Sequence, residues 1–308
     1  MPDDEPLGPD DPRRLGDYVL IGRLGEGGQG VVYLGRTRDD GLVAIKLLRG
    51  TTARARARFV READTARRVA APYTARVIDA DVTGDRPYIV SEFVEGPSLQ
   101  HVVEDRGPLS GSQLTRLAVR TAGALAAIHR AGVVHRDVKP GNVLLGPGGA
   151  KVIDFGVARV AAYGEPVTTN PVGTPAYMAP EQFEDEPPGA AADVFAWAAT
   201  VTYAATGRPP FGTGPATAVM HRIRSSAPDL TGLTGPLRRI VADCLAKEPR
   251  NRPTSAELVH ILRDRRAARR PARSRPVPAR HFGRRMLIAM AAVIVLGFVV
   301  GLLVPVGG

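Results

Sequence analysis

The pattern of apolar and polar positions divides the chain into a strand-rich part and a helix-rich part. Short β-like runs, rich in apolar residues, occur at residues 18–24, 30–36, 42–48, 77–82 and 87–93. Glycine, proline, aspartate or asparagine lies close to most of these runs, as expected for turns between strands. The pattern predicts a small β-sheet in the first third of the chain.

A helical pattern interrupts the strands at residues 53–70 and dominates from Leu99 onward. The clearest helix follows Ser110, which is predicted to form a capping box with Gln113, and Gly132 is predicted to end it. Strands followed by helices indicate an α+β protein with a small sheet lobe and a larger helical lobe.

The globular pattern covers residues 18–265, which divide into a sheet-rich part at 18–93 and a helix-rich part at 94–265. Residues 1–17 are rich in Pro, Gly and Asp. They contain neither a positively charged start nor an apolar run, so they do not form a signal peptide. We expect them to be a disordered lead-in.

The C-terminal residues have the composition of a membrane anchor. Residues 266–285 are rich in Arg, Pro and Ala and are predicted to be a linker. Residues 286–304 contain no charged or strongly polar side chain, and a helix of this length spans roughly 28 Å, close to the thickness of a bilayer. A buried core helix is the alternative. The arginines on the N-terminal side predict a single-pass protein of the cell membrane, with 1–285 in the cytoplasm and the tail 305–308 outside.

The net charge of +10 is concentrated in one place. Ten arginines and one aspartate between Arg263 and Arg285 give that segment a charge of +9, so the rest of the chain carries about +1. The segment lacks interleaved aromatic residues, which favours contact with anionic lipid over nucleic-acid binding. The composition, 44% hydrophobic and 23% charged, excludes wholesale disorder. Cys244 is the single cysteine, which excludes an internal disulfide and a zinc site of several thiolates, and favours a reduced compartment.

A glycine-rich segment follows the first predicted strand. Gly25, Gly27 and Gly30 fit the pattern G-x-G-x-x-G, in which the backbone can approach phosphate groups closely. A strand-like run follows these glycines, whereas a dinucleotide-binding turn would be followed by a helix. We refer to residues 25–30 as the glycine-rich loop.

A lysine ends the apolar run at residues 43–46. Burial of the Lys46 ammonium would be costly without a partner, and Glu62 in the helical stretch is the candidate. The alternatives are a lysine that reaches solvent at the sheet edge and a solvated glutamate.

The segment 135–142, His-Arg-Asp-Val-Lys-Pro-Gly-Asn, concentrates groups suited to phosphoryl transfer. Asp137 can accept or orient a proton, Lys139 can stabilise developing negative charge, and Asn142 can ligate a metal. Twelve residues later, Asp154 ends an apolar strand and is followed by Phe and Gly, so its carboxylate is a natural Mg²⁺ ligand.

Together these motifs resemble those of the eukaryotic-type (Hanks-type) Ser/Thr protein kinases of bacteria, of the membrane-anchored, actinobacterial kind. The resemblance covers about residues 18–265, with the signature segments at 43–46, 135–142, 154–156 and 179–181 in the expected order. It implies a bilobal fold with a small β-rich N-lobe containing one main helix and a larger helical C-lobe, here followed by a single transmembrane helix. It also implies transfer of the γ-phosphoryl group of ATP to Ser/Thr hydroxyls of proteins, with Mg²⁺ or alternatively Mn²⁺ as the metal.

The resemblance implies a role for each motif residue. Gly25, Gly27 and Gly30 would cover the ATP phosphates, and Lys46, paired with Glu62, would hold the α- and β-phosphates. Asp137 would orient and deprotonate the substrate hydroxyl, and Lys139 would contact the γ-phosphate. Asn142 and Asp154 would hold the metal.

Further roles follow from position in the family pattern. Adenine contacts are implied for Val32, Ala44, Leu144 and the hinge backbone at Glu92 and Val94, beside Ser91 at the gatekeeper position. For the apolar side chains a purely structural role stays open. Structural roles are implied for Asp193, which would anchor the catalytic loop or alternatively cap a helix, and for an ion pair between Glu181 and Arg252.

The family pattern also bears on specificity and control. Lys139 and a substrate-facing Thr174 match the Ser/Thr branch of the family. Arg136 precedes the catalytic aspartate, and a phosphate on Thr168 or Thr169 can pair with it and order the activation segment. We predict autophosphorylation at both threonines; the alternative is that they are ordinary loop residues.

Gly297 and Gly301 form a G-x-x-x-G pattern that would support a homodimer, although glycine is common in membrane helices.

Two other functions are alternatives to an active protein kinase. A pseudokinase scaffold is disfavoured because the lysine, the catalytic aspartate and both metal ligands are present. A small-molecule phosphotransferase is disfavoured by the segments 173–174 and 179–181. The expected partners are therefore ATP, protein substrates and membrane lipid, without nucleic acid.

Overall fold

The computed structural model describes residues 5–27, 30–48, 67–69, 72–81, 84–154, 175–183 and 188–264. No helix among these residues has the length and apolar character that a membrane crossing requires. The predicted linker at 266–285, the predicted span at 286–304 and the tail 305–308 lie outside the described residues. The predicted helical stretch at 53–70 also lies outside them, apart from residues 67–69.

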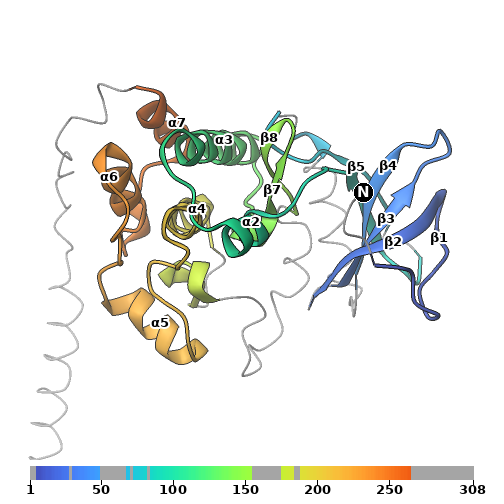
Figure 1. Cartoon of the computed structure of the whole chain (residues 1–308), viewed down its shortest axis with the longest axis horizontal. Coiled ribbons are helices and arrows are strands. Elements are labelled where there is room, and N and C mark those ends of the chain that lie inside the picture. Colours follow the sequence, from blue (N-terminus) through green and yellow to red (C-terminus); the bar gives the residue numbers. More distant parts are fainter. Residues whose placement is uncertain are drawn as a thin grey trace, which may run out of the picture. The chain divides into compact units, whose positions relative to one another are not determined.

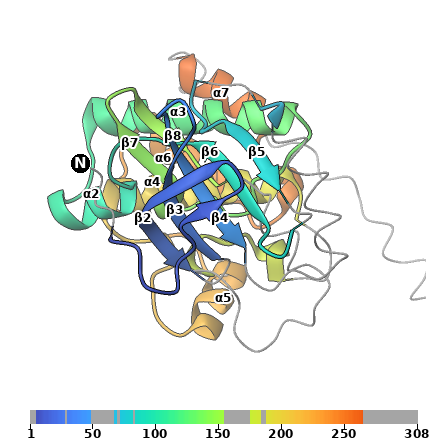
Figure 2. The ribbon, with the colours of Figure 1, turned by 90° about the vertical axis from the view of Figure 1, so that its right-hand side faces the viewer.

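Six strands form one antiparallel sheet in the N-terminal third of the chain (Figures 1 and 2). They are β1 (Arg14–Leu15), β2 (Tyr18–Gly27), β3 (Gly30–Arg36), β4 (Leu42–Leu48), β5 (Val77–Asp81) and β6 (Tyr88–Glu92). Their order in the sheet is β1-β2-β3-β4-β6-β5. The five strands predicted from the sequence are confirmed. Strand β2 continues three residues beyond its predicted end at residue 24, into the glycine-rich loop.

The two faces of this sheet have different tasks. Tyr33 and Ile45 lie opposite each other on β3 and β4 and are buried in a core on one face. On the other face, Val32 lies opposite Lys46, and Ala44 is two residues before that lysine. The strand period of two therefore places a lysine and two half-buried apolar side chains on one face.

Residues 5–17 make defined contacts with the sheet, so the expectation of a disordered lead-in does not hold for them. Strand β1 pairs with the start of β2, and Glu5 forms a backbone bridge with Arg23. The carboxylate of Asp11 is buried against Arg23 and Tyr33. These contacts join residues far apart in sequence, which local composition does not reveal.

The C-terminal part of the domain is helical (Figure 1). Its helices are α2 (Leu99–Arg106), α3 (Gly111–Arg130), α4 (Ala190–Thr206), α5 (Ala216–Ser225), α6 (Gly235–Cys244) and α7 (Ser255–Arg263), with short 3₁₀ turns η1 (Pro140–Asn142), η3 (Pro175–Tyr177), η4 (Pro180–Phe183) and η5 (Pro249–Asn251). Residues 192–204 of α4 are all buried, so this helix forms the centre of the lobe. Trp197 on α4 is fully buried and donates its indole N–H to Thr121 Oγ1 on α3 at 2.9 Å.

The predicted capping box at the start of α3 is wrong, although the helix itself is confirmed. Ser110 occupies the N-cap position, but its side chain makes no capping hydrogen bond. Gly111 has a φ of +51°, so the backbone of the first turn is irregular. Gly132 does end the helix, with a φ of +78° and its N–H donated to His129 O at 3.0 Å.

A two-stranded hairpin connects the sheet to the helical lobe. It consists of β7 (Val143–Gly146) and β8 (Gly149–Val152). Val152 N donates to Tyr73 O at 2.8 Å, on the segment that leads into β5, and Leu145 N donates to Pro97 O at 2.9 Å. The first contact ties the hairpin to the segment before β5, and the second ties it to the segment between β6 and α2.

Candidate active site

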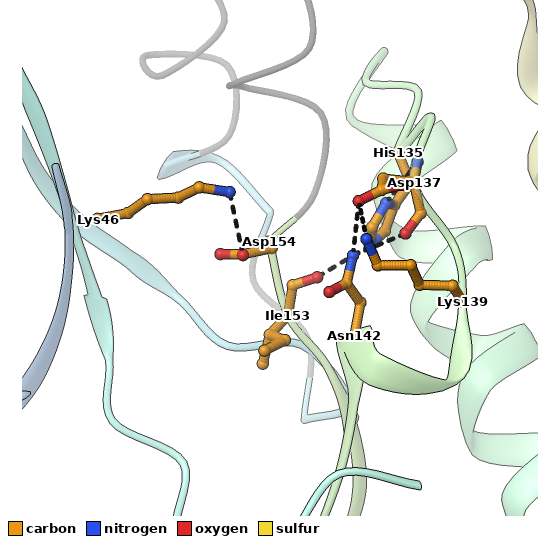
Figure 3. Close-up of polar contacts among 7 residues, drawn as sticks. All are labelled: Lys46, His135, Asp137, Lys139, Asn142, Ile153 and Asp154. Atoms are coloured by element: carbon orange, nitrogen blue, oxygen red, sulfur yellow. Dashed lines mark hydrogen bonds and ion pairs between the residues drawn. The ribbon is translucent and has the colours of Figure 1, made fainter. Parts of the chain in front are cut away.

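The catalytic loop, residues 135–142, brings three predicted site residues together (Figure 3). Lys139 Nζ lies 2.9 Å from Asp137 Oδ2. Asn142 Nδ2 donates to the same carboxylate oxygen at 3.1 Å and to Asp137 O at 2.8 Å. The carboxylate is thus held in place by a cation and an amide, both of which donate to it.

Asp193 on α4 holds the backbone of this loop. Its Oδ2 accepts from His135 N and its Oδ1 from Arg136 N, both at 2.7 Å. Its side chain is 1% exposed. Arg136 has a φ of +65°, a left-handed conformation that is costly for a residue with a side chain. The two hydrogen bonds stabilise this conformation, which sets the direction of the next residue, Asp137. Gly189 is the N-cap of α4, so the alternative of Asp193 as a helix cap does not apply.

His135 connects the catalytic loop to the strand end that carries Asp154. Asp137 N donates to His135 Nδ1 at 3.3 Å, so Nδ1 is an acceptor and the ring proton lies on Nε2. Nε2 lies 3.0 Å from Ile153 O, to which it donates. The ring is fully buried, and this burial lowers the pKa of His135 below its usual 6.5. A neutral imidazole with this one tautomer follows.

Asp154 lies across from Lys46 of the sheet (Figure 3). Lys46 Nζ and Asp154 Oδ2 are 3.1 Å apart, and their side chains are 14% and 31% exposed, so the contact is partly accessible to solvent. Asp154 has a φ of +57°, a second left-handed residue beside the site. The ion pair joins β4 to the second residue after β8, and it links the sheet lobe to the catalytic loop through Ile153.

Asn142 and Asp154 suit a magnesium ion that also binds phosphate. Both N–H contacts of the Asn142 amide go to Asp137, so its Oδ1 is the atom left to act as a metal ligand. Ile153 N donates to Asn142 O at 3.0 Å, which ties the two ligand-bearing segments together. The described residues contain no group of three or more His, Cys, Asp or Glu side chains that could hold a metal. One carboxylate plus an amide fits Mg²⁺, which usually completes its shell with water and substrate phosphate.

The three apolar side chains predicted to contact adenine are all partly exposed. Val32, Ala44 and Leu144 are each half-buried, whereas their strand neighbours Val31 and Val43 are buried in the core. A partly exposed apolar face of this kind can cover an apolar ring.

The hinge residues lie where β6 leaves the sheet. Glu92 is the last residue of β6, and Val94 lies two residues further on, before α2. The Glu92 side chain forms an ion pair with Lys151 of β8 and accepts a hydrogen bond from Arg76 N at 3.3 Å. With its side chain engaged in this way, Glu92 can contribute to nucleotide binding through its backbone. The sequence analysis did not identify the pairing with Lys151.

The glycine-rich loop continues the hairpin of β2 and β3. A Cβ atom added to Gly25 or Gly27 would meet no described atom within 4 Å, so the backbone there is accessible. Gly30 has a φ of +144°, and a Cβ at that position would lie 1.9 Å from Leu47 O. Glycine is therefore required at residue 30 for the hairpin to pack on β4.

Glu181 and Arg252 form the predicted ion pair. Arg252 Nη1 and Nη2 contact the two carboxylate oxygens of Glu181 at 2.6 and 2.9 Å, and the Arg252 side chain is fully buried. The same guanidinium donates to the carbonyl oxygens of Ala191, Ala246 and Lys247. The pair thus joins η4 to the start of α4 and to the segment before η5.

A cavity opens beside the catalytic aspartate. It is lined by residues of the catalytic loop together with Tyr177, Met178 and Gln182 of the η3–η4 segment, and with Asp193 and Ala196 of α4. Residues that flank the 179–181 motif therefore lie beside Asp137. Four predicted residues lie outside the described part of the chain: Glu62, Thr168, Thr169 and Thr174.

One supporting residue was missed in the sequence analysis. His129 Nε2 lies 2.8 Å from Asp193 Oδ2, and its Nδ1 lies 2.8 Å from Ser255 Oγ at the start of α7. A carboxylate only accepts, so Nε2 carries the proton. The available signal was the helical position of His129 near the end of α3, but a lone histidine on a helix has no specific meaning from sequence.

Comparisons with known proteins agree with this geometry. The model of the family described as "Protein kinase domain" matches residues 18–262. The chain is 44% identical over 262 residues to the probable serine/threonine-protein kinase PkwA of Thermomonospora curvata, covering 84% of this chain and 35% of that protein. It is 44% identical over 254 residues to the serine/threonine-protein kinase AfsK of Streptomyces coelicolor, covering 80% of this chain and 32% of that protein. It is 35% identical over 269 residues to the serine/threonine-protein kinase PknB of Mycobacterium tuberculosis, with 80% and 42% covered.

The match to the first two relatives covers about a third of their length. Among solved structures, the crystal structure of Rad53 1–466 in complex with AMP-PNP is similar to this chain, with a TM-score of 0.67 and 24% identity. It covers 79% of this chain and 64% of the Rad53 chain. At this identity the likeness shows the fold, and the predicted two-lobed architecture is confirmed.

Proposed function

Because this chain belongs to the protein kinase family, we propose that it transfers the γ-phosphoryl group of ATP to serine and threonine hydroxyls of proteins. The observation that carries the proposal is the convergence of Asp137, Lys139 and Asn142 within hydrogen-bond distance, opposite the ion pair of Lys46 with Asp154. This set contains a proton acceptor, two cations and two metal-ligand groups. A pseudokinase scaffold has no need of the whole set.

The residues act mainly by positioning and by charge stabilisation. Asp137 accepts the proton of the substrate hydroxyl, and its carboxylate is oriented by Asn142 Nδ2 and by the strained residue before it. Lys139, on the same carboxylate, is placed to neutralise charge on the transferred phosphoryl group. Lys46 holds the phosphates that remain with the nucleotide. Asn142 and Asp154 would hold Mg²⁺, which would supply positive charge to neutralise the phosphates.

A phosphotransfer assay tests the proposal. The full chain, in detergent or lipid, is supplied with ATP and Mg²⁺, and phosphate incorporation is followed by intact mass and peptide mapping. We expect incorporation on Ser and Thr in the wild type and a loss of at least about a thousandfold in Asp137→Asn, because this variant removes the proton acceptor but keeps its size. Asp105→Asn, at an exposed carboxylate of α2, is the control and should match the wild type. Equal incorporation in Asp137→Asn and the wild type would refute the assignment.

We further propose that the kinase is tethered to the cell membrane through residues 286–304, with the arginines of 266–285 against anionic lipid and the kinase domain in the cytoplasm. The support is the uninterrupted apolar run beside the +9 segment. Fractionation of cells that express the full chain, compared with a chain ending at residue 285, tests it. Equal amounts of both chains in the soluble fraction would contradict the tether. Gly301→Ile tests whether the predicted homodimer depends on the G-x-x-x-G pattern.

Autophosphorylation at Thr168 and Thr169 is the proposed mode of activation. A phosphate on either threonine would add nearly two negative charges that can pair with the Arg136 guanidinium. The backbone N–H groups of Arg136 and of His135 before it are both bound by Asp193. Peptide mapping of active enzyme should find phosphate on one or both residues. Full activity in the double variant Thr168→Ala/Thr169→Ala would contradict the proposal.

A further inference from the structure

Residues 5–15, here called the N-terminal strap, lie before the segment that the family model matches. They contact the strand that leads into the glycine-rich loop. Glu5 N donates to Arg23 O at 2.9 Å, and Arg23 N donates to Glu5 O at 2.8 Å. The strap therefore adds a short backbone pairing to β2, two residues before Gly25.

Asp11 is the buried centre of the strap. Its carboxylate side chain is 3% exposed. Oδ2 accepts from Arg23 Nε at 2.6 Å and from Gly8 N at 2.7 Å, while Oδ1 accepts from Arg23 Nη2 at 2.6 Å and from Tyr33 OH at 2.7 Å. Both oxygens are thus fully used, with the forked geometry that makes arginine–carboxylate pairs strong. These contacts hold the pKa of the Asp11 carboxyl well below its usual range, so it stays ionised at physiological pH.

The two partners of Asp11 define the base of the hairpin that carries the loop. Arg23 on β2 and Tyr33 on β3 lie directly opposite each other in the sheet. The second of two register shifts between β2 and β3 lies directly after this pair, between Arg23 and Gly25. Arg23 also contacts Glu26 Oε2, inside the loop, at 3.2 Å. One buried carboxylate therefore contacts both strands of the hairpin directly before the glycine-rich loop begins.

We infer that Asp11 is a positioning residue, which fixes the glycine-rich loop over the ATP phosphates by clamping Arg23 and Tyr33. The inference rests on the proposed function, since it assigns the strap a part in ATP binding. Asp11 acts through the hairpin base, because its carboxylate binds Gly8 N, Arg23 and Tyr33 OH. Its loss should loosen the loop while the catalytic loop, held by α4, keeps its geometry. ATP affinity should therefore fall more than the rate of the chemical step.

The test compares three full-chain variants. Asp11→Asn keeps the size of the side chain and removes its charge. Arg23→Lys keeps the charge and loses the forked contact, and it serves as a milder second variant if Asp11→Asn folds poorly. Asp17→Asn is the matched control: Asp17 also lies N-terminal to β2 and pairs with an arginine, Arg38, at 2.6 Å, but both side chains are mostly exposed.

Two measurements decide the outcome. The first is the Kd of MgATP, which should rise about tenfold in Asp11→Asn and by less in Arg23→Lys. A tenfold change in Kd corresponds to the free energy of about one hydrogen bond to a charged group. The kcat should stay within about threefold of the wild type. The second is amide hydrogen exchange in peptides that cover residues 20–34, which should become faster in both variants and stay unchanged in Asp17→Asn.

The two measurements separate the failure of this inference from that of the proposed function. A wild type that binds no MgATP would refute the proposed function, and the exchange data would still show whether Asp11 holds the loop. A variant Asp11→Asn with a lower melting temperature but with wild-type Kd and wild-type exchange at 20–34 would overturn the inference. In that case Asp11 would contribute to stability alone.

Discussion

Replacement of Asp193 by asparagine is the strictest test of how the active site is built. The carboxylate receives two backbone N–H groups at 2.7 Å and the His129 ring at 2.8 Å, all away from solvent. The amide side chain in Asp193→Asn would offer one oxygen and one NH₂ group. Whichever way that amide turns, one of the two backbone donors then faces another donor.

The magnitude follows from these contacts. A buried backbone N–H left without an acceptor costs about 1–3 kcal/mol, and the surviving bond loses its charge and about 1 kcal/mol with it. The free energy of unfolding should therefore fall by about 2–4 kcal/mol. For a domain of this size the melting temperature should fall by roughly 5–12 °C.

The effect on turnover should exceed the effect on nucleotide binding. Arg136 loses the bond that holds its left-handed conformation, so Asp137 shifts relative to the substrate hydroxyl. A displacement of about 1 Å at a reacting group costs on the order of a hundredfold in rate. We therefore expect kcat to fall about 10- to 100-fold. The KM for ATP should change by less than about threefold, because Asp193 makes no hydrogen bond to Lys46 or Asp154 among those of the described residues.

The assay measures kcat, the KM for ATP and the melting temperature for the wild type, Asp193→Asn and the surface control Asp105→Asn. The control should match the wild type in all three. A variant Asp193→Asn whose kcat lies within twofold of the wild type would refute the reasoning, even if its stability were reduced. That result would mean that the loop keeps its geometry without α4.

Two further predictions concern stability. Glu181→Gln should lower the free energy of unfolding by about 3–5 kcal/mol in urea titrations, because it leaves the fully buried Arg252 guanidinium without its charged partner; a change below about 1 kcal/mol would contradict this. Burial lowers the pKa of His135 in the folded protein below 6.5, so above pH 6.5 the histidine is neutral in both the folded and the unfolded protein, and below it the unfolded protein takes up the proton first. The free energy of unfolding should therefore decline as pH falls through 6.5, by up to about 1.4 kcal/mol per pH unit. In His135→Gln this contribution to the slope should be absent; equal slopes in both proteins would contradict the prediction.

Most of the sheet could be predicted because short runs of apolar, strand-favouring residues lie between turn residues. On one face of these strands Val31, Tyr33, Val43 and Ile45 are buried, while Val32, Ala44 and Lys46 on the other face are only partly buried. The order of the motifs was enough to predict which residues converge. Asp137, Lys139 and Asn142 lie within one loop, so their proximity is nearly inevitable.

Most of what the sequence did not reveal depends on contacts between distant residues. The buried Asp11 pairs with residues 12 and 22 positions away, and nothing in a Pro-, Gly- and Asp-rich segment signals such a partner. The link from His129 to Ser255 spans 126 residues. The capping box at Ser110 failed for a local reason, since its pattern was present but the left-handed Gly111 changed the first turn.

The attachment of the catalytic loop to α4 gives the two halves of the site different lifetimes. Both backbone N–H groups bound by Asp193 belong to the core of the helical lobe, so the proton-accepting half should persist for as long as that lobe stays folded. The contact of Lys46 with Asp154 is partly exposed and joins segments of two lobes, so it can break and reform far more often. Nucleotide can therefore enter and leave many times while the acceptor side of the reaction stays assembled, ready for the next substrate.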